Sequence, residues 1–394
     1  MLIDESKGEV ERVRLAGVDV LRGLSVLLVT LHHIHLRFWL DDRDVDHVLT
    51  STLNQVLFWS GYYAVIVFFV ISGFLITGLS LQRWGELGQI RVGRFYRMRA
   101  ARILPCLLLL LIVSSALHIA GIRGFTIDPA RASLGQALWS TLTFRINYLE
   151  GHHGYLPGNW DILWSLSVEE TFYLVFPLAC LLLRRGWMLT FLATCLLAIG
   201  PASRTLLAAQ DPWWQYSYFS CMDGIALGCL TAVVCARWHP SKSLLRIALL
   251  AGAALACSVI AACNEDSHTG FARYGLNVTL LEGAVALMLF AFGNGVGNRA
   301  IASGTGWLRR IGRSSYEIYL VHMLVVLALM DLFRAVRAAL WTIPLWYGAM
   351  LVCSVTAGRL FAGHYSEPLN RWLRATPSQD RLSGRAAVAE ASVD

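Results

Sequence analysis

Ionisable side chains stand inside apolar stretches of this sequence, and two of them have a spacing that suits chemistry. Arg22 and His33 lie eleven residues apart in one such stretch. Eleven helical residues make three turns plus about 20°, so the two side chains share one helix face and lie about 16 Å apart along its axis. Imidazole is a common general base, and guanidinium binds oxyanions. A plainer interpretation remains open, in which Arg22 is an interfacial anchor and His33 an ordinary interfacial histidine.

Two adjacent glutamates form a second candidate group. Glu169 and Glu170 follow Trp164 near the start of another apolar stretch. Neighbouring helical residues point about 100° apart, so at least one of these carboxylates faces protein or an aqueous cavity instead of lipid. We expect both at the depth of His33, where a carboxylate stabilises the imidazolium that forms when the histidine takes a proton.

Further polar residues accompany these groups. Arg99 and Arg102 are three residues apart on one helix face, as a phosphate clamp would require, although such arginines more often only set membrane orientation. Glu317 and His322 are predicted in the inner half of a later span, and Asp223 in the outer part of another. We predict supporting roles for these last three residues.

Neither a metal site nor a disulfide framework is predicted. Histidines cluster at residues 32–35 and 152–153, but at these spacings they do not converge on one ion from a single helix. Eight of the nine cysteines fall in apolar runs, without a Cys-x-x-Cys pair, which is typical of small buried hydrophobic residues.

Composition indicates the environment in which these residues work. The chain has 394 residues, of which 56% are hydrophobic and 15% charged. Soluble domains carry about 25% charged residues, so a soluble enzyme, a disordered protein and a nucleic-acid binder are excluded. The sequence therefore predicts an integral membrane protein.

Apolar stretches of about 20 residues, the length that crosses a bilayer as a helix, occur ten times. They lie near residues 16–38, 56–81, 103–122, 164–183, 187–208, 218–236, 244–262, 275–293, 315–333 and 341–362. We therefore predict an all-α polytopic bundle of about ten transmembrane helices.

The distribution of basic residues predicts the orientation of this bundle. Arginines crowd the connection between the second and third stretches, and later connections of the same parity are also basic. The first connection of opposite parity has four aspartates, at positions 41, 42, 44 and 46, against Arg43. Because Lys and Arg concentrate on the cytoplasmic side, both termini are predicted in the cytoplasm of a multi-pass plasma-membrane protein.

One membrane domain is expected, over residues 16–362, between a cytoplasmic lead-in at 1–15 and a polar cytoplasmic tail at 363–394. Neither a signal peptide nor an attached soluble module is expected. The longest outer connection, residues 123–163, should contain a short helix near 134–144. Its aromatic and histidine side chains are the predicted determinants of acceptor specificity: Trp139, His152, His153, Tyr155 and Trp160.

Several motifs together resemble the acyltransferase 3 family of membrane O-acyltransferases. Arg22 and His33 match its Arg/Lys-x10-His signature. The other motifs are FFVISGFLI at 68–76, RAARILP at 99–105, WSLSVEETFYL at 164–174, SYEIYLVH at 315–322 and YSEP at 365–368. They follow the family's order from about residue 16 to 370.

The resemblance implies a ten-helix domain that transfers an acyl group, usually acetyl, from acyl-CoA to a hydroxyl, often of a sugar. His33 would be the catalytic histidine, Arg22 its motif partner, and Arg99 and Arg102 donor-side contacts. One departure is the Cys221-Met222-Asp223 segment, where the family often has Arg-x-Asp. Many relatives also carry a C-terminal esterase-like domain, which is not expected here.

We therefore expect acyl-CoA as co-substrate, no bound cofactor, and an acceptor on a surface polysaccharide, a glycolipid or the sugar of a secreted metabolite. A macrolide-type product is an alternative acceptor, and a transporter or flippase for a lipid-linked or acidic solute is an alternative function. Direct transfer and a covalent acyl-histidine are both open. The expected partners are the lipid bilayer and the two substrates, without nucleic acid; the oligomeric state is open.

Overall fold

The computed structural model describes residues 15–43, 45, 49–183, 186–262 and 275–374. All regular elements in these segments are helical, and ten helices or helix runs there are long and apolar enough to cross a membrane. The predicted all-α membrane bundle is thus confirmed.

The ten spans are built on helices that match the predicted stretches closely. These helices are α1 (Ala16–Trp39), α3 (Gly61–Trp84), α4 (Val92–Ile119), α8 (Leu163–Leu182), α9 (Gly186–Leu206), α11 (Tyr218–Arg237), α12 (Lys242–Ala262), α13 (Leu276–Gly293), α16 (Ser315–Ala335) and α17 (Ile343–Phe361). Short helices connect or flank them: α2 (Ser51–Phe58), α5 (Leu134–Leu142), α6 (Ile146–His153), α7 (Gly158–Asp161), α10 (Trp213–Tyr216), α14 (Asn298–Ala302), α15 (Gly306–Arg313) and α18 (Glu367–Arg374).

One boundary differs from the prediction. Helix α4 begins at Val92, whereas its apolar stretch was expected to begin near residue 103. A search for apolar residues does not detect the arginine-rich first turns, although arginine is a good helix former. Arg99 therefore lies about two turns inside a continuous helix, which fixes its direction relative to Arg102.

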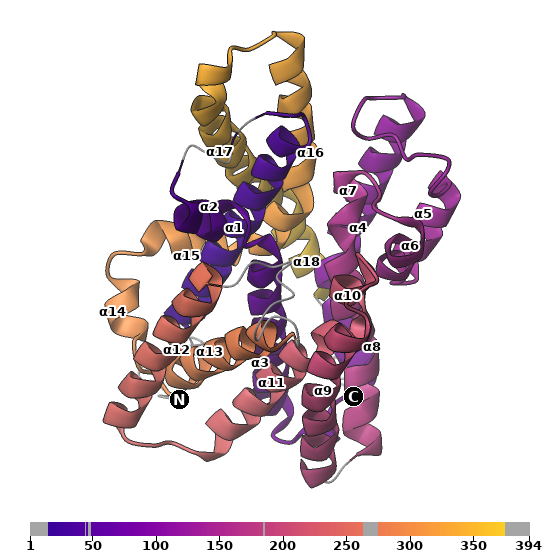
Figure 1. The fold of residues 1–394 in the computed structure, drawn as a ribbon. Helices are drawn as coiled ribbons and strands as arrows, with labels where there is room; N and C mark the ends of the chain where they lie inside the picture. Colours follow the sequence, from indigo (N-terminus) through magenta and orange to yellow (C-terminus); the bar gives the residue numbers. More distant parts are fainter. Residues whose placement is uncertain (1–14, 44, 46–48, 184–185, 263–274, 375–394) are drawn as a thin grey trace, which may run out of the picture.

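Helix α3 occupies the centre of the bundle and packs against α1, α11 and α13 (Figure 1). Its backbone comes very close to that of α11 at two glycines. A Cβ atom at Gly73 would collide with the backbone of Ile225, and one at Gly228 with the backbone of Val70. Small residues permit such close helix packing in membranes, where apolar side chains alone provide little driving force.

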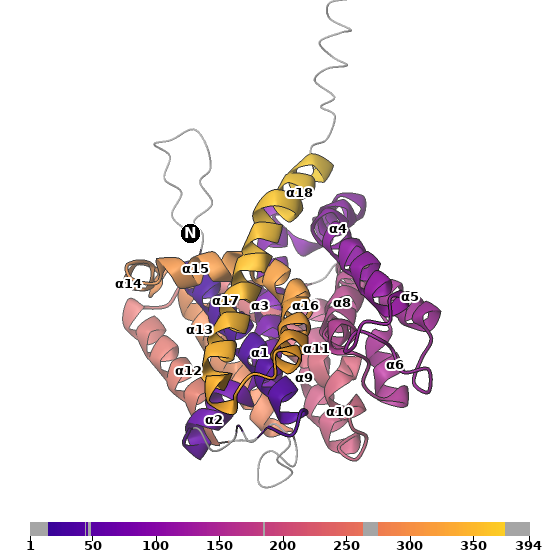
Figure 2. The same cartoon turned by 90° about the horizontal axis from the view of Figure 1, so that it is seen from above.

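The helices run between two sides of the bundle, which Figure 2 shows at opposite ends of the view. The side at which α15 and α18 lie is called the α15 side, and the side at which α2 and α10 lie is called the α2 side. The predicted cytoplasmic face corresponds to the α15 side. Helix α1 runs from the α15 side to the α2 side, and α16 runs in the same direction beside it.

The long connection between α4 and α8 has the helix that was expected near 134–144. It is α5, which begins with a capping box in which Ser133 and Gln136 bond reciprocally. At the other end of the chain, a π-helical turn over Ala362–Ser366 joins α17 to α18. Residues 363–374 of the predicted tail are therefore helical, whereas residues 1–14 of the predicted lead-in and 375–394 lie outside the described residues.

Candidate active site

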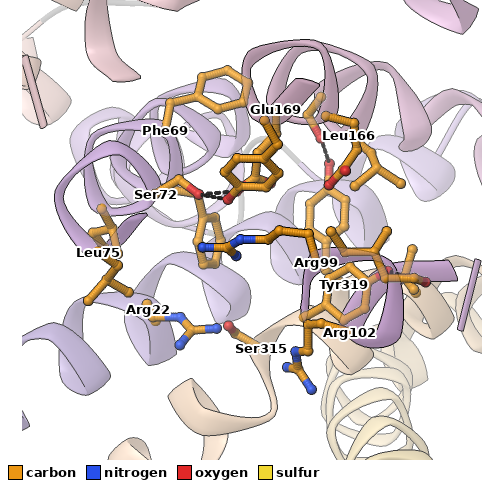
Figure 3. A pocket seen from close by; sticks show the side chains of 18 of the residues that line it. Arg22, Phe69, Ser72, Leu75, Arg99, Arg102, Leu166, Glu169, Ser315 and Tyr319 are labelled. Atoms are coloured by element: carbon orange, nitrogen blue, oxygen red, sulfur yellow. Dashed lines mark hydrogen bonds between the residues drawn. The ribbon is translucent and has the colours of Figure 1, made fainter. Parts of the chain in front are cut away.

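A cavity of about 280 Å³ lies between α1, α3, α4, α8 and α16 (Figure 3). Its lining includes Arg374 of α18, which places it toward the α15 side. It brings together five of the residues predicted from the sequence. These are Arg22 from α1, Arg99 and Arg102 from α4, and Glu169 and Glu170 from α8. Segments far apart in the chain therefore meet at this cavity.

Arg102 is held by a carboxylate on a neighbouring helix. Its Nη1 and Nη2 donate to the two oxygens of Glu317, at 2.6 and 3.2 Å. Ser366, in the π-helical turn, donates to Glu317 Oε1 at 2.6 Å. Such turns often occur at functional sites. The two-point contact fixes the plane of the guanidinium and compensates its charge.

Arg22 and Arg99 have no such compensation. Neither forms a salt bridge with a carboxylate among the described residues, although both line the cavity. The Arg99 guanidinium lies over the ring of Tyr173, 4.4 Å from its centroid, which is a cation–π contact. Two cations without ion-pair partners make this cavity suitable for an anionic group.

The two glutamates of α8 have separate environments. Glu169 accepts hydrogen bonds from Ser72 of α3 and from Tyr173 one turn later. Glu170 is 7% exposed, and its Oε1 has no hydrogen-bond partner among the described residues. Neither glutamate contacts His33, so the expected His–Glu contact is absent from the described part of the chain and the catalytic roles of both glutamates stay predictions.

His33 instead contacts a second histidine. His322 Nε2 lies 3.1 Å from His33 Nδ1, and His33 Nδ1 also lies 3.0 Å from the carbonyl oxygen of Val29. His322 Nδ1 is 2.6 Å from the carbonyl oxygen of Tyr319. Because a carbonyl only accepts, the hydrogen-bond network assigns the proton of each neutral ring to Nδ1.

This assignment gives the two histidines different tasks. His322 Nε2 carries a lone pair and accepts from His33 Nδ1–H. The lone pair of His33 is then on Nε2, which forms no hydrogen bond among the described residues. His33 is thus oriented through one nitrogen and is a free base at the other, the arrangement that general-base catalysis requires.

Glu317 and His322 both lie in the first half of α16, as predicted, but they have different partners. Glu317 meets Arg102 beside the cavity, whereas His322, about 7.5 Å further along α16, meets His33.

Tyr319 links the cavity to this histidine pair. Its side chain lines the cavity, and its hydroxyl lies 2.7 Å from Ser165 Oγ and donates to the Ile162 carbonyl at 3.0 Å. Its own carbonyl orients His322. Tyr319 is therefore in contact with both the cavity and the histidine pair, although neither His33 nor His322 is among the residues that line the cavity.

Asp223 lies away from the cavity, in a buried ion pair with an arginine that the sequence analysis missed. Arg204 of α9 donates to both oxygens of Asp223, at 3.2 and 2.8 Å, and also to Thr279 at 2.8 Å. Arg204 thus gives Asp223 a cationic partner from another helix, in a chain that has Cys221 at the arginine position of the family's Arg-x-Asp pattern. The signal was present, since Arg204 stands inside the predicted 187–208 span and arginine is rare there.

Comparison with known proteins agrees with the motifs. Residues 15–362 match a family described as an acyltransferase domain. The peptidoglycan O-acetyltransferase OatA of Listeria monocytogenes is 23% identical over 366 residues, covering 86% of this chain and 54% of that protein. The O-acetyltransferase OatA of Staphylococcus aureus is 27% identical over 168 residues, covering 42% and 24%. No solved structure matches the chain.

The chain spans between about a quarter and about half the length of these relatives. The family match covers all ten helices up to the end of α17 and includes every predicted site residue. It favours acyl transfer over the transporter alternative. This multi-pass membrane protein therefore belongs to the acyltransferase-domain family.

Proposed function

We propose that this protein is a membrane O-acyltransferase that moves an acyl group, acetyl in the first instance, from acyl-CoA to a hydroxyl group of a carbohydrate. The observation that carries the proposal is the orientation of His33. Its Nδ1 is held by Val29 and His322, which leaves the Nε2 lone pair free, and Tyr319 connects this histidine pair with a cavity lined by arginine. Such a base activates a hydroxyl for attack on a thioester.

The donor end of the site is the cavity. Coenzyme A carries phosphate groups, and arginine binds phosphate through charge-assisted hydrogen bonds. Arg22 and Arg99 are the candidate contacts, since both lack an ion-pair partner among the described residues. Arg102 adds a third cation, whose direction Glu317 fixes. In the predicted orientation the cavity faces the cytoplasm, where acyl-CoA is made.

The transfer step uses the two nitrogens of His33 differently. His33 Nε2 takes the proton of the acceptor hydroxyl while the hydroxyl oxygen attacks the thioester carbonyl carbon. The tetrahedral intermediate collapses with cleavage of the C–S bond, and the imidazolium returns the proton to the thiolate. His322 accepts from Nδ1–H throughout and so stabilises the imidazolium. In a two-step route the same Nε2 lone pair would attack the thioester first.

The carbohydrate acceptor is supported by the Listeria relative, which is named as a peptidoglycan O-acetyltransferase. A glycan of the cell envelope also suits a multi-pass protein whose catalytic histidine lies inside the bundle. The plasma membrane is accordingly the proposed location.

The direct test uses full-length protein in lipid nanodiscs with radiolabelled acetyl-CoA and chitotetraose, a soluble N-acetylglucosamine oligomer. Free CoA thiol and the mass of the oligomer are measured. Wild type and His239→Ala should both give acetylated oligomer. His239 is exposed, follows the end of α11 and pairs with Asn294, so it takes no part in the His33–His322 contact. His33→Ala should form acetylated oligomer at least about 100-fold more slowly. Equal product from His33→Ala would contradict the proposal.

The natural acceptor can be identified in cells. Glycolipids, surface polysaccharide and excreted metabolites are compared by mass spectrometry among the wild type, a deletion strain and the deletion strain rescued with His33→Ala. A mass increment of one acyl group that only the wild type shows would identify both acceptor and acyl chain. Accumulation of a solute on one side of the membrane, without any mass change, would instead favour transport.

A further inference from the structure

Polar side chains continue beyond the histidine pair toward the α2 side. Arg37 follows His33 by about one turn of α1, and it lies within electrostatic range of His33, His322 and Asp161. Helix α7 packs directly on it: a Cβ atom at Gly158 would lie 3.0 Å from Arg37 Nη2. The end of the 120–162 connection is therefore in contact with the α1 turn that follows the catalytic histidine.

Asp161 and Asn159 stand on the same short helix. Asp161 is 8% exposed, and its Oδ1 accepts from the hydroxyl of Tyr216 at 2.7 Å. Asn159 is fully buried, yet neither Nδ2 nor Oδ1 of its amide has a hydrogen-bond partner among the described residues. The same holds for Arg37 Nε.

Unpartnered polar atoms of this kind need an explanation. A buried amide that forms no hydrogen bond has lost its water without compensation, and native proteins almost always supply a partner. Asn159 lacks one on both atoms, next to an arginine that also lacks one. Within the described part of the chain nothing supplies these partners, and water or a bound ligand can do so.

The chemistry of these side chains indicates the class of ligand. The guanidinium group donates hydrogen bonds, the carboxylate accepts them and the amide does both. Together they match neighbouring hydroxyls, each of which both donates and accepts. An aromatic stack adjoins them, since the rings of Trp164 and Tyr216 are parallel with centroids 4.4 Å apart. Apolar walls with a few convergent polar groups are typical of small-molecule sites. A sugar ring has this combination of faces and hydroxyls.

We propose that Arg37, Asn159 and Asp161 form the acceptor subsite, which holds the hydroxyls of a sugar beside His33 on the α2 side. This inference rests on the proposed function. In this arrangement the two substrates approach from opposite sides of the bundle. The donor enters the arginine-lined cavity from the α15 side, and the acceptor hydroxyl reaches His33 Nε2 from the α2 side. The ester forms where the two meet.

The subsite differs from the specificity determinants expected from the sequence. Trp139 is 68% exposed, and His152, His153 and Tyr155 are exposed as well. Only Trp160 of that group is buried, beside Asn159. The polar residues of α7, not the aromatic residues of the outer loop, are thus adjacent to the turn that carries Arg37.

Asn159→Leu tests this assignment because the two substituents are similar in size and leucine has no polar atoms. If Asn159 binds sugar hydroxyls, KM for chitotetraose in the nanodisc assay rises at least tenfold, kcat falls less than threefold, and Tm does not fall. If Asn159 is only a structural residue, KM stays within twofold of wild type, which overturns the proposal. A fall in Tm with loss of kcat at unchanged KM overturns it too.

Asn147→Leu is the matched control. Asn147 is also fully buried, but its Nδ2 donates to the Tyr216 carbonyl at 3.0 Å, so leucine should lower Tm and leave KM unchanged. Asp161→Asn provides a second variant that keeps the size of the side chain and its contact with Tyr216. It should raise KM for chitotetraose in the same way, and an unchanged KM counts against the subsite even where Asn159→Leu does not fold.

A binding measurement separates this proposal from the proposed function. Saturation-transfer NMR detects chitotetraose on the full-length protein in nanodiscs without acetyl-CoA, with maltotetraitol as a second polyol probe. Binding by wild type and its loss in Asn159→Leu would support the subsite even if no acyl transfer occurs, in which case only the proposed function fails. Absence of binding of both probes to wild type, or equal binding to Asn159→Leu, overturns the subsite.

Discussion

His322 Nε2 lies 3.1 Å from His33 Nδ1, a contact between helices α16 and α1 across 289 residues of sequence. Backbone carbonyls at Val29 and Tyr319 fix the proton of each ring on Nδ1. In the proposed function, His322 would therefore act through His33, as a positioning residue. The contact resembles the carboxylate–histidine arrangement of hydrolases in function, with a neutral imidazole in place of the carboxylate.

Variants of the two histidines should lose activity to different degrees. His33→Ala removes the general base and should lower kcat by roughly 10²–10⁴-fold. His322→Phe removes one neutral hydrogen bond, about 1 kcal/mol, and should lower kcat by about 5–10-fold. His322→Gln, whose side-chain amide reaches the place of Nε2, should recover most of that loss. The measurement is acetyl transfer to chitotetraose; no loss in His322→Phe would show that the contact does not orient the base.

Replacing either unpaired arginine of the cavity should weaken acetyl-CoA binding without lowering the stability of the protein. Arg22→Gln or Arg99→Gln removes a cation without an ion-pair partner among the described residues, so KM for acetyl-CoA should rise about 10–100-fold, the value of a charge-assisted hydrogen bond. Tm should stay within a few degrees of wild type. Initial rates at varied acetyl-CoA and thermal unfolding in detergent measure both quantities.

Glu317→Gln is the contrasting variant for the same cavity. Glu317 is buried and compensates Arg102, so its loss leaves a partly buried cation and should cost about 3 kcal/mol of stability. A lower Tm is the primary expected effect. A rise in KM for acetyl-CoA without a lower Tm would show that the Arg102–Glu317 contact does not stabilise the fold.

The spans and the shared face of Arg22 and His33 could be predicted because both follow from local properties. Length and hydropathy identify a membrane helix, and helical periodicity fixes which side chains share its face. The ten helices lie within a few residues of the predicted stretches, apart from the start of α4.

Contacts between helices could not be predicted in this way. The sequence of α16 does not reveal how far the helix is shifted relative to α1, so the contact of His322 with His33 was not predicted. A difference of about one turn decides which residue of α16 meets His33 and which meets Arg102. Likewise, the sequence did not indicate that Ser72 and Tyr173 donate to Oε1 of Glu169, one of the two glutamates expected to contact His33.

The Arg204–Asp223 pair should contribute to stability and not to the chemistry. Both side chains are almost fully buried, so Asp223→Asn leaves an uncompensated arginine and should cost about 3–5 kcal/mol. The double variant Arg204→Met/Asp223→Leu removes both charges and should recover most of that loss.

Arg334→Gln is the control. Arg334 pairs with Asp41, but the arginine side chain is about a quarter exposed, so the loss of stability should stay near 1 kcal/mol or below. Unfolding in detergent measures all three, and equal losses in the single and double variants would contradict the prediction.

Glu150 should make stability depend on pH. It lies in α6, outside the membrane spans, where burial and the nearby Asp161 raise the pKa of its carboxyl well above the usual range. A raised pKa means that the folded protein holds this proton more tightly than the unfolded chain. The contribution of Glu150 is therefore most favourable below the ordinary glutamate pKa of about 4.3 and is lost as pH rises through the raised value.

Glu150→Gln should keep the hydrogen bond from Leu156 and flatten this part of the profile, so that the variant is the more stable protein at neutral pH. Tm between pH 5 and 8 in detergent is the measurement, with Asp128→Asn as an exposed control in the same connection; parallel profiles for wild type and Glu150→Gln would show that Glu150 is ionised in the fold.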